Sequence, residues 1–291
     1  MRIAYHIGAN CTDDDRLLKS LLKNADTLAR DGIRVPGPGK YRNLLRKTLR
    51  GLEDAPTPED AREVLLDEIV DGSEIDGLVM SYSQFLCFPK RIFENGLFYE
   101  LANEKIGGMR RIFPDDQICY FMGMRNPATF IPAVFASQND WDYAKFMRRL
   151  DPRAVLWSDA VIRIRRADPN AELTVWCDED SPLIWAQLVR LVAGIDPMTR
   201  INGGFDLLQS LLTDNGMKRF VAYLRTHPPQ TEAHKRRVIA AFMEKYARPD
   251  VMEQEIDLPG WDQALVEDLT ANYLDDIEKV RRIEGVTFIG A

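Results

Sequence analysis

The fold of this chain is decided by its first residues, Met1-Arg-Ile-Ala-Tyr-His-Ile-Gly-Ala-Asn-Cys-Thr-Asp-Asp-Asp15. The segment 2–7 is short and mostly apolar, which predicts a buried strand, and Gly8 predicts a tight loop after it. A helix is expected to open at Thr12 or Asp13. In many α/β proteins a strand, loop and helix in this order hold a phosphate, because the loop amides and the helix dipole point at an anion. Here the predicted helix opens on three carboxylates instead.

Outward from this stretch, strands and helices alternate as far as about Ile195, and only helices are expected after it. Alternation predicts a mostly parallel sheet of four or five strands with helices on both faces. The expected strands cover 2–7, 76–81, 117–125 and 172–177. The expected helices cover 12–30, 41–52, 57–70, 99–113, a segment from the Pro at 127 to 137, 143–150, 152–166, a segment from 183, and then 205–212, 217–225, 231–246 and 262–282. The predicted fold class is therefore α/β, a three-layer P-loop-like fold. Its expected domains are residues 1–195 and a helical C-terminal portion, 196–291, packed on them, or one single domain over 1–291.

The composition limits the classes of function. The 291 residues carry a formal net charge of −7, which argues against a general nucleic-acid binder. The sequence contains no apolar run of the ~18 residues that a membrane span needs, and its beginning does not have the pattern of a signal peptide. The four cysteines are far apart and include no Cys-x-x-Cys pair, so we expect no zinc site and a reduced, cytoplasmic protein.

Several segments together carry a family resemblance. The first strand continues as His6-Ile-Gly-Ala-Asn-Cys-Thr-Asp-Asp-Asp15, a Gly-Pro-rich turn covers 32–39, and the strand at 117–125 ends in Arg125. The tail from Trp261 to Ile289 adds a further match. In these features the chain resembles the bacterial sulfotransferase-like proteins, which have a P-loop α/β fold. In that family the first strand ends in His-Ile-Gly-x-His-Lys-Thr-Gly-Thr-Thr.

The resemblance implies transfer of a sulfuryl group from 3′-phosphoadenosine-5′-phosphosulfate (PAPS) to a hydroxyl or an amine. It places the 5′-phosphate on the loop, here Gly8, Ala9, Asn10, Cys11 and Thr12. It places the 3′-phosphate on Arg125 and on a serine eight residues later. This chain departs from the family pattern: Cys11 stands at the lysine position, Asp13, Asp14 and Asp15 stand at the Gly-Thr-Thr positions, and Ala133 stands at the serine position, with Ser137 one helical turn further on.

These departures leave two functions open. One is an active sulfotransferase-type transferase anchored by Arg125 and the loop backbone. The other is a catalytically inactive binding or regulatory module for a small-molecule or phosphorylated ligand, with a protein partner that the sequence does not indicate. A bound phosphate would face the loop carboxylates at a cost of about 4 kcal/mol for each pair at ~4 Å and an effective dielectric of ~20. A third, weaker interpretation is a phosphate held through a metal on Asp13 and Asp14.

Each candidate residue also has a structural interpretation. His6 is a general base or a hydrogen-bonded structural residue. Cys11 is a thiol activated by a helix N-terminus or a small filler of the loop. The three aspartates bind a metal or cap the helix. Arg125 binds an anion or pairs with one of the loop aspartates.

The segment 35–42 is a substrate-gripping loop or simply a turn. The basic run that follows is a solvated helix face or a surface for an acidic substrate or partner. Its members are Lys40, Arg42, Arg46, Lys47 and Arg50.

Overall fold

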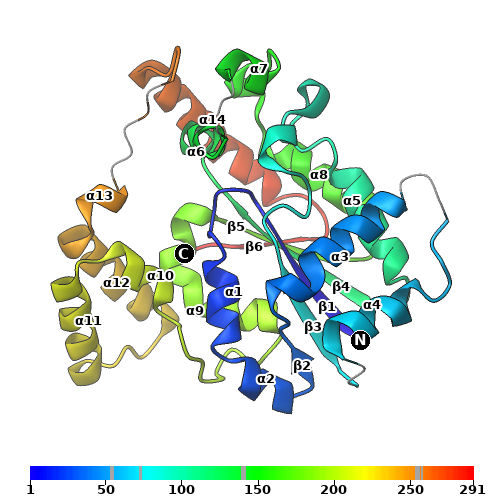
Figure 1. Ribbon diagram of the computed structural model, residues 1–291. Coiled ribbons are helices and arrows are strands. Elements are labelled where there is room, and N and C mark those ends of the chain that lie inside the picture. Colours follow the sequence, from blue (N-terminus) through cyan, green and yellow to red (C-terminus); the bar gives the residue numbers. More distant parts are fainter. Residues whose placement is uncertain (53–55, 72–73, 139–141, 253–255, 257) are drawn as a thin grey trace.

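A computed structural model describes residues 1–291 except 53–55, 72–73, 139–141, 253–255 and 257. Its centre is a six-stranded sheet in the order β2-β3-β1-β4-β5-β6, and every pairing within the sheet is parallel (Figure 1). The strands are β1 Arg2–Gly8, β2 Ile33–Arg34, β3 Gly77–Ser81, β4 Gln117–Met124, β5 Glu172–Cys177 and β6 Val286–Ile289. The predicted three-layer α/β class with a parallel sheet is confirmed.

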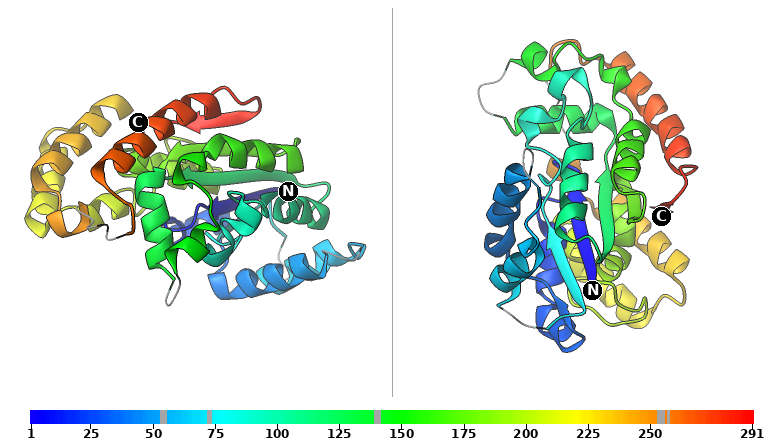
Figure 2. Two further views of the ribbon diagram at one scale, coloured as in Figure 1. Left: turned by 90° about the horizontal axis from the view of Figure 1, so that it is seen from above. Right: turned by 90° about the vertical axis from the view of Figure 1, so that its right-hand side faces the viewer.

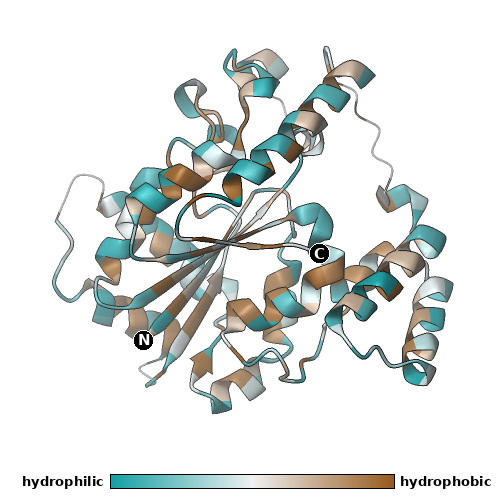
Figure 3. Ribbon diagram, turned by 180° about the vertical axis from the view of Figure 1, so that it is seen from behind, coloured by the Kyte–Doolittle hydropathy of each residue, from teal (hydrophilic) through white to brown (hydrophobic). Residues whose placement is uncertain are grey.

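The central strands are apolar on both faces, as Figure 3 shows by their brown colour. In β1, Ile3 and Tyr5 belong to the core on one face, while Ala4 belongs to the core on the other. Successive side chains of a strand point to opposite faces, so a strand buried on both sides needs an unbroken apolar run. This is why β1 and β4 stand out in the sequence.

Helices cover both faces of the sheet. The larger core lies under α3 Pro38–Gly51, α4 Ala61–Val70, α5 Ala102–Ile112, α6 Pro127–Ala136, α7 Tyr143–Met147, α8 Trp157–Ala167 and α14 Gln263–Val280. The other face packs against α1 Arg16–Leu22, α2 Ala25–Arg30, α9 Ser181–Ala193 and α10 Asp206–Leu211. Short 3-10 turns occur at 89–91, 94–96, 152–154 and 178–180. Within the described ranges, none of these helices is both long and apolar enough to span a bilayer.

The residues after Ile195 divide into two groups. The helices α10, α11 Asp214–Thr226 and α12 Glu232–Tyr246 share a small core around Phe220 and lie beside α9, at one side of the molecule (Figure 2). After α13 Pro249–Met252, the chain returns through α14 to β6, which pairs with β5. The prediction that the C-terminal portion is purely helical is therefore wrong, because this portion supplies an edge strand, β6, to the sheet. Whether it forms a domain of its own stays a prediction.

Several boundaries differ from the predicted ones. The helix expected over 12–30 begins at Arg16 and is broken into α1 and α2. The break falls at Asn24, whose side chain bonds the Ser20 carbonyl and both backbone groups of Asn202 at 2.7–2.9 Å. Such side-chain bonds to the backbone compete with helix continuation.

Other differences are shorter shifts. The helix α3 begins at Pro38 rather than Tyr41, with proline at its first position, and α4 begins at Ala61 rather than near Thr57. The sheet has six strands rather than four or five, because β2 and β6 have only two and four residues. Edge strands this short leave no periodic signal.

The topology creates one crevice at the carboxyl edge of the sheet. After β1 the chain turns to the face covered by α1, whereas after the neighbouring strands β3 and β4 it turns to the face covered by α5 and α6. Loops that leave adjacent strands in opposite directions open a crevice where α/β proteins bind ligands. The site is therefore sought at the ends of β1 and β4.

Candidate functional site: the loop after β1 and the cavity beside it

The loop after β1 begins with a glycine that no other residue replaces easily. Gly8 has a φ of +114°, and a Cβ at this position would lie 3.1 Å from the Ser83 carbonyl oxygen. The next peptide bond, Gly8–Ala9, is cis, and the Ala9 amide donates to the Gly123 carbonyl of β4. The loop is thereby fixed to the strand beside it.

Asp15 stands at the N-cap position of α1 without a side-chain cap bond, and the carboxylate of Asp13 serves the first turn instead. Asp13 Oδ2 accepts the Leu17 amide at 2.9 Å, and the Asp13 carbonyl accepts the Arg16 amide at 2.8 Å. The side chain is 8% exposed. A carboxylate here satisfies free amides of the first turn and meets the positive end of the helix dipole. The Leu17 amide and the positive end of α1 thus already have an anion that the protein itself supplies.

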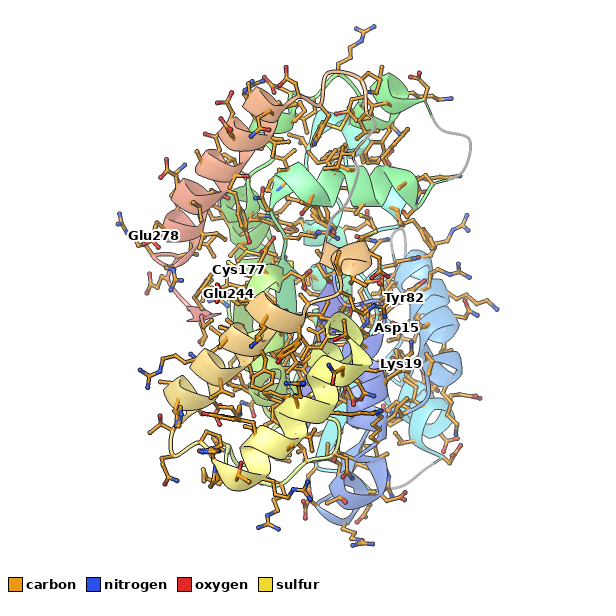
Figure 4. All side chains as sticks on the ribbon, turned by 90° about the vertical axis from the view of Figure 1, so that its left-hand side faces the viewer. Asp15, Lys19, Tyr82, Cys177, Glu244 and Glu278 are labelled. Atoms are coloured by element: carbon orange, nitrogen blue, oxygen red, sulfur yellow. The ribbon has the colours of Figure 1, made fainter. Side chains whose placement is uncertain are left out.

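The other two loop aspartates turn to different partners. Asp15 forms a bidentate ion pair with Arg42 of α3, with N···O distances of 2.6 and 2.9 Å. The same Arg42 guanidinium also lies 4.6 Å from the centre of the Tyr82 ring. Asp15 and Tyr82 are therefore close together beside α3, as Figure 4 shows. Asp14 is exposed and pairs with Arg16 at 3.3 Å. Within the described residues no group of three or more His, Cys, Asp or Glu is placed to hold a metal ion.

Arg125 reaches the loop from the end of β4. Its Nη1 donates to the Cys11 carbonyl at 2.8 Å, and its Nε donates to Thr129 Oγ1 at 3.0 Å. These contacts place Arg125 against the loop backbone. The carboxylate of Asp15 is paired by Arg42, a residue that the sequence did not connect to the loop.

A second carboxylate of the protein accepts a backbone amide at the same edge. Glu179, just after β5, accepts the Asn126 amide at 2.8 Å, and its other oxygen accepts the Tyr273 hydroxyl at 3.1 Å. Next to it, burial and the charge of Glu179 raise the pKa of Asp178 to about 7, while Arg125 opposes this shift. The carboxyl edge beside β4 therefore carries acidic side chains, and its Asn126 amide already has a hydrogen-bond partner within the protein.

His6 lies on the far side of β1 from the loop cavity described below. It is 1% exposed, bonds Ser81 Oγ through Nδ1 at 2.8 Å, and stacks on Trp176. Its Nε2 has no hydrogen-bond partner in the part of the chain that the structure describes. Burial lowers the pKa of His6, so the ring is neutral at neutral pH. An acceptor in that cavity would not touch His6, and the geometry gives no support to the general-base interpretation.

A cavity of about 440 Å³ opens beside the loop and brings four of the predicted residues together, the metal candidate Asp14 among them. Asn10, Cys11 and Ser137 line it, along with Asp14 and Lys90. The remaining lining comes from Ser83, Gln84, Phe88, Pro89 and Gln138. Gly8, Ala9, Thr12 and Arg125 support the loop from outside this lining, and Thr12 Oγ1 bonds the Ala9 carbonyl at 2.8 Å.

The polar groups of this cavity are largely engaged. Asn10 is buried, and its backbone amide donates to the Tyr99 hydroxyl, which in turn donates to Asn10 Oδ1. The side-chain Nδ2 of Asn10 donates to the Cys87 carbonyl. Burial raises the pKa of Cys11, and its thiol lies 3.7 Å from the Ala133 carbonyl. The thiol is therefore protonated at neutral pH, which matches the filler interpretation of Cys11.

Sequence reasoning named Arg42 only as a member of the basic run, and it did not identify Tyr99, Asp178 and Glu179 as residues of this site. A signal existed for the last two, because Asp178-Glu-Asp180 directly follows a predicted strand and so falls at the carboxyl edge. Tyr99 and Arg42 carried no such signal, since they come from distant segments. Comparisons with family models, curated proteins and solved structures find no match for this chain.

Proposed function

We propose that this protein is a binding or regulatory module without sulfuryl-transfer activity, whose phosphate loop is held by its own side chains. The observation that carries the proposal is the hydrogen bond from the Leu17 amide to the Asp13 carboxylate. This bond uses the amide and the dipole that would otherwise stabilise a phosphate. The Glu179 contact to the Asn126 amide supports the same conclusion on the neighbouring strand end.

Electrostatics support the proposal. A nucleotide phosphate on this loop would approach the carboxylate of Asp13 and, on the β4 side, that of Glu179. A like-charge pair at ~4 Å costs on the order of 4 kcal/mol at an effective dielectric of ~20. The nearby arginines already have partners, since Arg42 binds Asp15 and Arg125 binds the Cys11 carbonyl. A phosphate would have to compete with these groups.

The alternative function is PAPS-dependent sulfuryl transfer. One observation favours it: Asn10, Cys11 and Ser137 line a single cavity that also contains Lys90. In this alternative, Lys90 supplies the cation that the loop lacks, and Ser137 takes the role implied for the serine after Arg125. The acceptor would then enter the same cavity.

Isothermal titration calorimetry separates the two functions. The wild-type protein and the Arg125→Ala variant are titrated with PAPS and with its desulfated product, with and without magnesium. Arg225→Ala on α11 serves as the matched control, because Arg225 is exposed and distant from the loop. We expect no saturable heat at millimolar nucleotide. Micromolar binding that Arg125→Ala abolishes and Arg225→Ala keeps would overturn the proposal in favour of the transferase.

A further inference from the structure

A second cavity, of about 590 Å³, lies next to the first and shares Gln84 and Phe88 with it. We name it the α3 groove. Its walls are α3, the segment after β3, and the start of α5. The groove is distinct from the phosphate loop, and the inference below does not depend on whether PAPS binds.

The α3 groove is strongly cationic in a chain whose net charge is −7. Six basic side chains line it and, among the described residues, no carboxylate does; the six are Arg42, Arg46, Lys47, Arg50, Arg91 and Lys105. Arg42, Arg91 and Lys105 are paired with Asp15, Glu94 and Glu104, respectively. Within the described ranges Arg46, Lys47 and Arg50 form no ion pair. Three cations on one helix wall therefore remain for an external anion.

Two of the arginines are already held in place by aromatic rings. The guanidinium of Arg46 lies 5.8 Å from the centre of the Phe88 ring, and that of Arg42 lies 4.6 Å from the centre of the Tyr82 ring. Arg42, Arg46 and Arg50 follow one another every four residues, so they form one stripe with a rise of about 6 Å between neighbours. A guanidinium fixed in this way loses less freedom when its planar fork meets a carboxylate, sulfate or phosphate.

The floor of the groove is apolar. Leu49, Phe85 and Leu86 are buried beneath it, whereas Phe88 is 41% exposed at its edge. An ordinary solvated helix face has charged side chains that point into water with no enclosing wall. Here the largely exposed basic stripe is one wall of a groove that is open to solvent on one side and has aromatic and aliphatic side chains at its base, with a volume in the range of small-molecule sites.

We propose that the α3 groove binds a small molecule that carries an anionic group on an apolar body. The anionic group meets Arg46 and Arg50, and the apolar body lies against Phe88 and Leu101, the apolar lining residues that keep accessible surface. Both parts are required, because neither the exposed cations nor the apolar floor alone accounts for the shape and charge of the groove. This assigns a ligand class to the basic run for which the sequence left two interpretations open.

Calorimetry with four probes tests the proposal. 2-Naphthoate presents a carboxylate on a flat apolar body, and decanoate presents it on a chain. Naphthalene-2-carboxamide lacks the charge, and acetate lacks the apolar body. We expect at least one of the two amphipathic anions to bind about tenfold or more tightly than the carboxamide and acetate. Comparison of 2-naphthoate with decanoate distinguishes an aromatic from an acyl ligand.

Variants locate the binding. Arg46→Gln with Arg50→Gln is expected to weaken the better anion about tenfold or more, because each lost guanidinium removes a charge-assisted contact. Phe88→Ala, a change at an exposed position, is expected to weaken it as well. The matched control is Arg200→Gln with Arg225→Gln, two exposed arginines outside the groove, with an expected change within about twofold.

Circular dichroism melting shows whether each variant is folded, and Arg46→Gln and Arg50→Gln are made singly if the double variant is not. The proposal is overturned if acetate or the carboxamide binds as well as the amphipathic anions. It is also overturned if the control pair weakens binding as much as the groove pair, or if neither amphipathic anion binds. None of these results bears on the PAPS titration, so the two proposals fail independently.

Discussion

Replacing Asp13 by alanine tests whether the loop after β1 depends on its own anion. The Asp13 carboxylate is nearly buried and accepts the Leu17 amide at 2.9 Å. Loss of such a bond to a first-turn amide costs typically ~1 kcal/mol, within a range of about 0.5–2 kcal/mol. Loss of a negative charge at the helix start adds about 0.3–1 kcal/mol. The free energy of unfolding is therefore expected to fall by about 1–3 kcal/mol.

Urea unfolding followed by tryptophan fluorescence measures this change. Trp185 is a suitable reporter, because its Nε1 donates to Ser20 Oγ of α1 at 3.2 Å. Asp13→Asn keeps an oxygen acceptor and loses the charge, so its loss of stability should be smaller than that of Asp13→Ala. Asp14→Ala is the control, because Asp14 is exposed and its pair with Arg16 is expected to contribute less than about 1 kcal/mol.

The reasoning is refuted if Asp13→Ala is as stable as the wild type, or if Asp14→Ala is equally damaging. In the first case the bond between the Asp13 carboxylate and the Leu17 amide would contribute nothing to the free energy of unfolding, and the carboxylate would not stabilise the start of α1. An equal effect of Asp13→Asn and Asp13→Ala would assign the contribution to the charge, which both variants lose, rather than to the hydrogen bond, whose acceptor Asn keeps.

Three further predictions concern the same edge of the sheet. The pKa of Asp178 is raised to about 7 from 3.8, so between about pH 4 and pH 7 the carboxyl is ionised in the unfolded protein but still protonated in the folded one, and stability falls as pH rises through this window; Asp178→Asn should therefore be more stable than the wild type at pH 8, with a smaller difference at pH 5, in urea melts at both pH values. Gly8→Ala should destabilise by about 1–3 kcal/mol, because φ is +114° and the new Cβ lies 3.1 Å from the Ser83 oxygen; an unchanged thermal midpoint would contradict this. Arg42→Gln breaks a half-buried bidentate pair with Asp15 and should cost about 1–3 kcal/mol, while Arg34→Gln, on the short strand β2, should change the urea midpoint little.

The sequence allowed the central strands and the fold class to be predicted, because both are written in local patterns. A strand buried on two faces must be apolar throughout, as in β1 and β4, and helices between such strands require a parallel sheet. The ends of elements were less predictable. The start of α1 moved to Arg16, and the break at Asn24 depends on Asn202, which is far along the chain.

The ligand-binding role of the candidate residues stays a prediction, although the structure brings several of them together. Asn10, Cys11 and Ser137 do line one cavity, and Arg125 does contact the loop. The pairing of Asp15 with Arg42 was not predicted, since it joins a loop to a helix that the sequence described only as a basic face.

The sequence by itself determined that this chain folds around a buried parallel sheet and that the loop after its first strand carries three carboxylates. Only the tertiary structure decided what each carboxylate does: one accepts an amide in the first turn of α1, one pairs with an arginine of α3, and one is exposed. The physical reason is range. Periodicity and composition act over a few residues, whereas a hydrogen bond or an ion pair is fixed by which distant segments the folded sheet brings within about 3 Å of each other.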